Sequence, residues 1–109
     1  SCSNLTQLKC EITGISSLPL TNQPKLWLLW AHSCPNMASV DLSGCPVLTD
    51  VFLSVNASLV TIDISKCAFT MNYLHAHESP LLEKIIMKTG QTIVGDFLYN
   101  PGVVIERVN

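Results

Sequence analysis

The stretch from residue 26 to residue 64 decides the fold, and it reads LWLLWAHSCPNMASVDLSGCPVLTDVFLSVNASLVTIDI. Apolar residues recur in it as L-x-x-L-x-L, at a spacing of about eleven residues. The four units take these positions from Leu26, Leu29, Ala31; Met37, Val40, Leu42; Leu48, Val51, Leu53; and Leu59, Ile62, Ile64. The last two apolar positions of each unit lie two residues apart, which is the period of a strand with one buried face. Each unit therefore predicts a short strand.

The same frame extends in both directions along the chain. It continues through Leu5, Leu8, Cys10; Ile15, Leu18, Leu20; Met71, Leu74, Ala76; and Leu82, Ile85, Met87. Every one of these positions is apolar, whereas a composition of 48% apolar residues would fill about half of them by chance. Two successive units make one coil of about 22 residues, so alternate units are expected to stack into two parallel sheets around a shared core.

A second column of residues follows each unit by three positions, and we expect it to mark the corners of the coil. Its members are mostly small polar residues and cysteines: Thr13, Gln23, Cys34, Cys45, Asn56, Cys67, Ser79 and Gly90. Compact side chains of this kind can bond backbone groups that point inward at a tight corner. Asn56 should therefore be buried and its sequon not glycosylated, and the thiols of Cys10, Cys34, Cys45 and Cys67 should be unpaired packing groups.

Two runs, VDLSGC at residues 40–45 and IDISKC at residues 62–67, resemble the L-D-V-S-x-N/C runs of short-repeat, internalin-like leucine-rich-repeat proteins of bacterial cell surfaces. The resemblance covers residues 2–90, although the units that start at Leu26 and Met71 lack the Asp. It implies a β-rich leucine-rich-repeat solenoid, a right-handed coil of short parallel strands with little helix. Residues 1–90 would form the solenoid. Residues 91–109 would form a C-terminal capping segment, with a turn at residues 100–102 and a terminal strand over residues 103–108.

Length and charge exclude several classes of function. A chain of 109 residues makes one domain, and its net charge of −2 without a basic run argues against nucleic acid as a partner. The longest apolar block is too short to cross a bilayer, so no transmembrane segment is expected.

Candidate catalytic and metal-binding residues are few. No nucleophile or glycine-rich loop stands at a catalytic spacing from His32, His75 or His77. His75 and His77 could form a metal pair, but the sequence fixes no third ligand for it. Asp41 and Asp63 occupy equivalent repeat positions, which explains them without calcium. We therefore predict a protein that is not an enzyme and has no metal and no cofactor.

The outward positions of one sheet gather aromatic side chains, whereas those of the other sheet are ordinary. We define the aromatic face as Trp27, Leu28, Trp30, Phe52, Tyr73 and His75. A contiguous aromatic cluster on an outer strand face is typical of a surface that binds a protein or a glycan. The rival interpretation, of comparable weight, is that Phe97, Leu98 and Tyr99 fold over the two tryptophans.

By the resemblance, the expected function is non-catalytic binding of a protein or glycan at a bacterial cell surface. The protein would be extracellular, secreted or lipid-anchored, although the corner column accounts for Cys2 without an anchor. The alternative is a structural spacer, or a fragment of a longer leucine-rich-repeat protein, with no ligand of its own.

Overall fold

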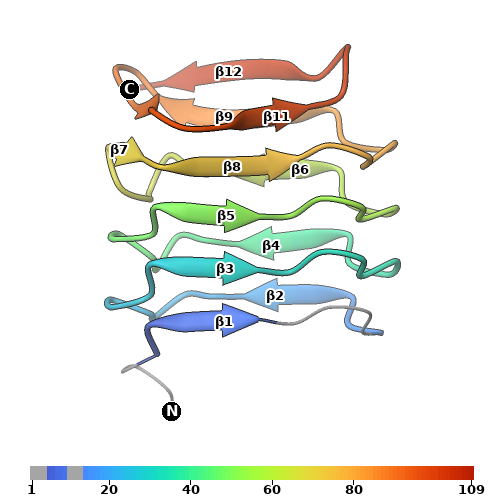
Figure 1. The fold of residues 1–109 in the computed structure, drawn as a ribbon, viewed down its shortest axis with the longest axis horizontal. Helices are drawn as coiled ribbons and strands as arrows, with labels where there is room; N and C mark the ends of the chain where they lie inside the picture. The colour runs from blue at the N-terminus through green and yellow to red at the C-terminus, as the bar shows by residue number, and fades with distance from the viewer. Residues whose placement is uncertain (1–4, 10–13) are drawn as a thin grey trace.

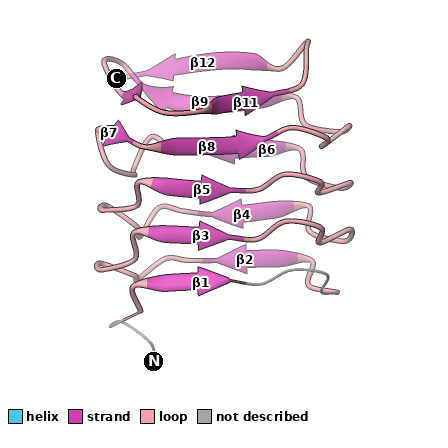
Figure 2. Ribbon diagram, in the orientation of Figure 1, coloured by secondary structure: helices cyan, strands magenta, loops and turns pink. Residues whose placement is uncertain are grey.

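The computed structural model describes residues 5–9 and 14–109, which form a β-solenoid of parallel strands without a helix (Figure 2). The strands are β1 (Gln7–Lys9), β2 (Ser17–Pro19), β3 (Leu28–Trp30), β4 (Ser39–Asp41), β5 (Asp50–Phe52), β6 (Thr61–Asp63), β7 (Thr70–Met71), β8 (Tyr73–Ala76), β9 (Lys84–Lys88), β10 (Thr92–Ile93), β11 (Phe97–Tyr99) and β12 (Val104–Val108). With no helix in these ranges, none of the described segments could span a membrane as a helix.

Strands alternate between two sides of the solenoid, as the repeat predicts. The front layer of Figure 1 is one parallel sheet in the order β1-β3-β5-β8-β11. Behind it lie β2 paired with β4, and the sheet β12-β9-β6, whose strands run in the opposite direction to those in front (Figure 1). Pairing joins residues one coil apart, for example Leu29 with Val51 and Ile62 with Ile85. The expected parallel solenoid with a period near 22 residues is confirmed.

The core lies between the two layers and consists of the repeat positions. Every predicted apolar position from Leu20 to Met87 is buried, and Leu53 and Ile62 are fully so. Leu5, Leu8, Ile15 and Leu18 are partly buried against this core. Cys10, also predicted to be a core residue, lies outside the described residues.

The C-terminal segment adds a strand to each side of the solenoid. Strand β11 pairs with β8, and β12 pairs with β9 over five residues, which places the predicted terminal strand at Val104–Val108. Phe97 packs partly buried against the core. Residues 97–99 therefore lie beside β8 in the front sheet and not over β3, the strand that carries Trp30. Strands β7 and β10 form a short ladder that the repeat did not predict. It joins the coil that contains β8 to the coil that contains β11.

One line of corners is held by the buried side chain of Asn56. Its Nδ2 donates hydrogen bonds to the carbonyl oxygens of Leu53 at 2.7 Å and Ala31 at 2.9 Å. Its Oδ1 accepts a hydrogen bond from the backbone N–H of Cys34 at 2.8 Å. Asn56 thus satisfies three backbone groups on two successive coils, as the column predicts.

Gln91 does the same at the other line of corners. Its Nε2 donates to the carbonyl oxygens of Ile64 at 2.8 Å and Ala68 at 2.9 Å, and its Oε1 accepts from the backbone N–H of Lys88 at 2.9 Å. The sequence column placed Gly90 here. Gly90 instead adopts φ 87°, so the turn takes one residue more and the bonding side chain comes one place later.

Left-handed backbone recurs directly before three corner residues. Ser33, Val55 and Glu78 have φ values of 60°, 60° and 57°. The N–H of Ser33 donates to the carbonyl of Ser54, and the N–H of Val55 donates to the carbonyl of His77. The conformation is therefore part of the repeat, but a β-branched valine is strained in it.

The described corner cysteines are buried packing residues. Cys34, Cys45 and Cys67 are all buried, and no disulfide joins Cys45 to Cys67. Burial raises the pKa of the Cys45 thiol to about 11 and that of Cys67 to about 12. The Cys45 thiol donates to the carbonyl oxygen of Leu20 at 3.5 Å. Cys2, like Cys10, lies outside the described residues.

Candidate functional site

Three residues of the aromatic face form one column across the front sheet. Strand pairing sets Trp30 opposite Phe52, and Phe52 opposite His75. The ring centroids of Trp30 and Phe52 are 4.8 Å apart, and those of Phe52 and His75 are also 4.8 Å apart. The side chains therefore contact one another at the strand spacing, as the sequence frame predicted.

Tyr73 extends this network along β8. Its ring lies 6.1 Å from that of Phe52 and 6.2 Å from that of His75, and the residue is 39% exposed. Gly95 makes room for it, because a Cβ atom at Gly95 would lie 2.7 Å from Cε1 of Tyr73. Tyr73 thus adds an exposed ring to the network.

The remaining two members of the aromatic face differ in exposure. Trp27 immediately precedes β3 and is 39% exposed, so the C-terminal segment does not seal it. Leu28 occupies an outer position of β3 but is only 9% exposed. Leu28 therefore supports its neighbours and offers little surface of its own.

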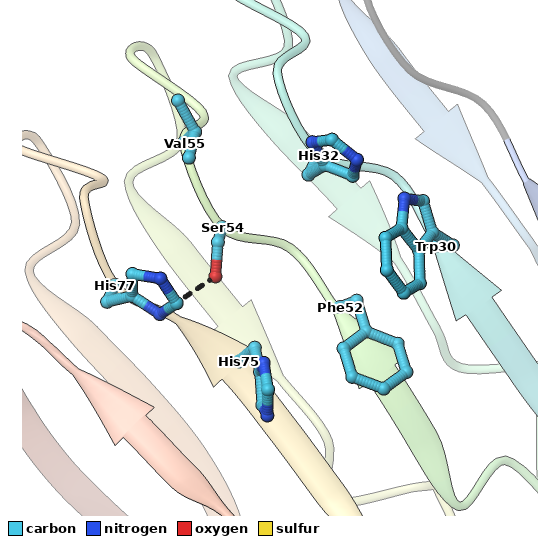
Figure 3. A pocket seen from close by; sticks show the side chains of 7 residues that line it. All are labelled: Trp30, His32, Phe52, Ser54, Val55, His75 and His77. Atoms are coloured by element: carbon cyan, nitrogen blue, oxygen red, sulfur yellow. Dashed lines mark hydrogen bonds between the residues drawn. The ribbon is translucent and has the colours of Figure 1, made fainter.

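A shallow hollow of about 210 Å³ lies over the column of Trp30, Phe52 and His75 (Figure 3). We call it the histidine groove, because it contains all three histidines of the chain. It is lined by Trp30, His32, Phe52, Ser54, Val55, His75 and His77. The sequence frame named Trp30, Phe52 and His75 but missed the others. His32, Ser54 and His77 each follow one of the named residues by two positions, which was the available signal.

Polar atoms border the groove on its corner side. The hydroxyl of Ser54 and Nδ1 of His77 form a hydrogen bond of 3.1 Å, drawn in Figure 3. Nδ1 of His32 and the hydroxyl of Ser33 are hydrogen-bonded at 3.0 Å. Hydroxyl and imidazole groups both donate and accept, so this border can adapt to either kind of ligand group.

His75 sits between the rings and an acidic neighbour. Its Nε2 atom lies 3.5 Å from Oδ2 of Asp96. That nitrogen is buried and has no hydrogen-bond partner within the described part of the chain. Polar atoms of this kind are normally bonded, but this one is buried beside the Asp96 carboxylate and is not exposed to a ligand in the groove.

A second polar group lies on β5 beside Tyr73. Oδ1 of Asp50 accepts hydrogen bonds from the hydroxyl of Thr49 at 2.9 Å and from Nδ2 of Asn72 at 3.0 Å. Pairing also places Asp50 next to Tyr73 across the sheet. The carboxylate is thus held in a fixed orientation on the outer face.

A further hollow of about 380 Å³ lies at β11. It is lined by His77, Phe97, Leu98 and Tyr99, and so shares His77 with the histidine groove. The rings of Phe97 and Tyr99 are 4.9 Å apart. Pairing with β8 sets Leu98 opposite the outward His75, whereas Phe97 and Tyr99 lie opposite the buried Leu74 and Ala76. Residues 97–99 therefore do not cover the two tryptophans, and their rings do not belong to the aromatic face.

Among the residues that the structure describes, the opposite side offers no comparable arrangement of rings. Asp41 and Asp63 there accept hydrogen bonds from Ser43 and Ser65, which follow each of them by two residues. Hydrogen bonds from Ser43 lower the pKa of Asp41. These are repeated local turns, and residues 5–9 and 14–109 contain no group of three His, Cys, Asp or Glu placed to hold a metal ion.

No protein-family model, curated protein or solved structure matches this chain. The assignment of a β-solenoid therefore rests on the repeat and on the strand pairing described above.

Proposed function

We propose that the protein is a non-catalytic binding module whose ligand, a protein or a glycan, covers the aromatic face. The observation that carries the proposal is the ring network of Trp30, Phe52, Tyr73 and His75 on the outer side of the front sheet. Outer strand positions normally face water, where a contiguous aromatic cluster gains little until a partner covers it.

The setting of the rings supports binding over a purely structural role. The core is complete without them, because the inward positions of β3, β5 and β8 are already buried. The groove between them keeps a volume of about 210 Å³. Rings that merely packed the sheet would not need the polar border that Ser54 and His77 supply.

We further propose that the chain is a short-repeat leucine-rich-repeat protein of the internalin-like class, extracellular or at a bacterial cell surface, with the C-terminal segment as its cap. Support comes from the VDLSGC and IDISKC runs and from the period near 22 residues. A secreted or lipid-anchored state is the expectation of that class.

Parallel arrays of purified glycans and purified extracellular proteins test the binding function. Each array is probed with the wild-type chain, with Phe52→Ala and with Thr61→Ala, a control on the opposite sheet. We expect at least one spot that wild type and Thr61→Ala bind equally and that Phe52→Ala loses by about tenfold or more. Circular dichroism melts confirm that each variant is folded. If no spot on either array depends on Phe52, the aromatic face is not a binding site and the structural spacer becomes the better account.

A further inference from the structure

We infer that the ligand is an uncharged glycan, and that the histidine groove holds one of its hexopyranose residues. This inference rests on the proposed binding function and selects one of its two ligand classes. It follows from the chemistry of the groove floor, from its border and from the charges around it.

The floor of the groove is aromatic and spans adjacent strands. Trp30 and Phe52 lie 4.8 Å apart with their ring planes tilted by 42°, and His75 meets Phe52 edge to face. A hexopyranose ring has an apolar face of C–H groups, which packs on aromatic rings. Large planar side chains provide such a surface at low cost in conformational entropy.

The border of the groove matches the hydroxyl rim of a sugar. Ser54 and His77 are close enough to bond each other, and His77, whose side chain is 41% exposed, can also bond a hydroxyl in the groove while the largely buried Ser54 holds its ring. An imidazole of this kind can bond an OH that serves as both donor and acceptor. An apolar protein side chain in the same place would cover polar atoms without bonding them, which costs free energy.

Charges around the groove disfavour an anionic ligand. Carboxylates of Asp96 and Glu78 lie 3.5 Å and 3.9 Å from the lining residues His75 and His77, and Asp50 lies farther back on β5. The outer positions of β3, β5 and β8 carry no lysine or arginine. Lys9, which pairs with Trp30 across the sheet, is the basic residue beyond that edge. Acidic polymers such as polyuronates would meet repulsion from three carboxylates, whereas an uncharged glycan would not.

Asp50 provides a second contact point for the same chain of sugars. Its Oδ1 is occupied by Thr49 and Asn72, so the carboxylate is fixed and needs no reordering when it accepts a hydroxyl. Tyr73 lies beside it across the strand pair and offers a ring for stacking. A glycan that occupied the groove and this point would run obliquely over β5 and β8.

The test uses the purified chain and hexasaccharides of glucose, mannose, galactose and N-acetylglucosamine, with hexagalacturonic acid as the anionic comparison. Binding is followed by tryptophan fluorescence and by calorimetry. We expect at least one uncharged hexasaccharide to bind and hexagalacturonic acid not to bind. Ser54→Ala should weaken binding about three- to tenfold, and Phe52→Ala at least tenfold, whereas Thr61→Ala should leave it unchanged.

The outcomes separate this inference from the proposed function. Failure of all four uncharged hexasaccharides, equal binding of hexagalacturonic acid, or indifference to Ser54→Ala would overturn the inference. If protein spots on the array still depend on Phe52, the binding function stands and its ligand is a protein. If nothing depends on Phe52, both are wrong.

Discussion

The backbone N–H of Cys34 donates a 2.8 Å hydrogen bond to Oδ1 of Asn56, a residue 22 positions later in the chain. This bond ties the corner of one coil to the corner of the next. Nδ2 of Asn56 also donates to the carbonyls of Ala31 and Leu53. One side chain therefore bonds three backbone groups that would otherwise be buried without partners.

We predict that Asn56→Ala destabilises the protein by about 3 kcal/mol or more, because it leaves these three buried groups unpaired. Urea unfolding followed by circular dichroism measures the change. Asn36→Ala, at an exposed turn position, is the matched control and should stay within about 0.5 kcal/mol. Similar effects of the two substitutions would show that the corner bonds are not important for stability.

The repeat frame makes a prediction about the core. Leu53 is fully buried between neighbouring coils, so Leu53→Ala should cost about 2 to 5 kcal/mol. Thr61 lies on the outer side of β6, and Thr61→Ala should change stability by less than about 0.5 kcal/mol. Denaturant melts of both variants check the assignment, which equal losses would contradict.

Val55 combines a φ of 60° with a β-branched side chain and 43% exposure. Asparagine tolerates left-handed backbone better, so Val55→Asn should raise the free energy of unfolding by about 1 kcal/mol. Val47, 44% exposed but without a left-handed φ, gives the control Val47→Asn, for which we expect no gain. A fall in the melting temperature of Val55→Asn would mean that the valine side chain stabilises the corner by packing.

The buried thiols predict a loss of stability in alkali. The pKa values of Cys45 and Cys67, about 11 and about 12, exceed the ordinary 9.0, so the folded state holds these protons more tightly than the unfolded state. Their contribution is complete below about pH 9 and declines as the pH rises toward 11 and 12. Urea melts from about pH 8 to about pH 11 should show that the free energy of unfolding falls with pH. The double variant Cys45→Ala/Cys67→Ala should show a smaller fall. If the free energy of unfolding falls equally steeply with pH in the wild type and the double variant, this account is wrong.

Thiol counting tests the same residues chemically. In denaturant without reductant, we expect the thiols of Cys10, Cys34, Cys45 and Cys67 all to react, whereas in the folded protein Cys45 and Cys67 should be protected by burial. The readout is mass spectrometry after alkylation. The joint loss of two thiols with a mapped bridge from Cys45 to Cys67 would disprove the packing role.

Most of the fold followed from apolar spacing, because a solenoid repeats one local pattern and each coil contacts its neighbours. The spacing predicted that Leu29, Val51 and Leu74 would lie side by side in the core, and strand pairing confirms it. The spacing of apolar residues could not reveal the extra residue in the last corner, where Gln91 and not Gly90 bonds the backbone. Which residue bonds there depends on the local φ, and Gly90 adopts a positive one.

The site was harder to predict than the core. The outward column of Trp30, Phe52 and His75 follows from alternation along a strand, and the structure brings these rings together. The same alternation continues past the third apolar position of each unit, where Ser54 and His77 complete the groove, but the L-x-x-L-x-L pattern ends at that position. The left-handed conformation of Val55 has no composition signal, since valine is among the residues least expected there.

Because β3, β5 and β8 each supply one row of the histidine groove, the length of the groove depends on how many coils carry a suitable residue in that column. Duplication of a coil between β5 and β8 would lengthen the surface by one strand spacing, roughly 4.8 Å, and leave the pairing rules of both neighbours intact. One coil of about 22 residues is therefore the structural unit of this surface. The groove would then change in length by whole coils, while the fold stays the same.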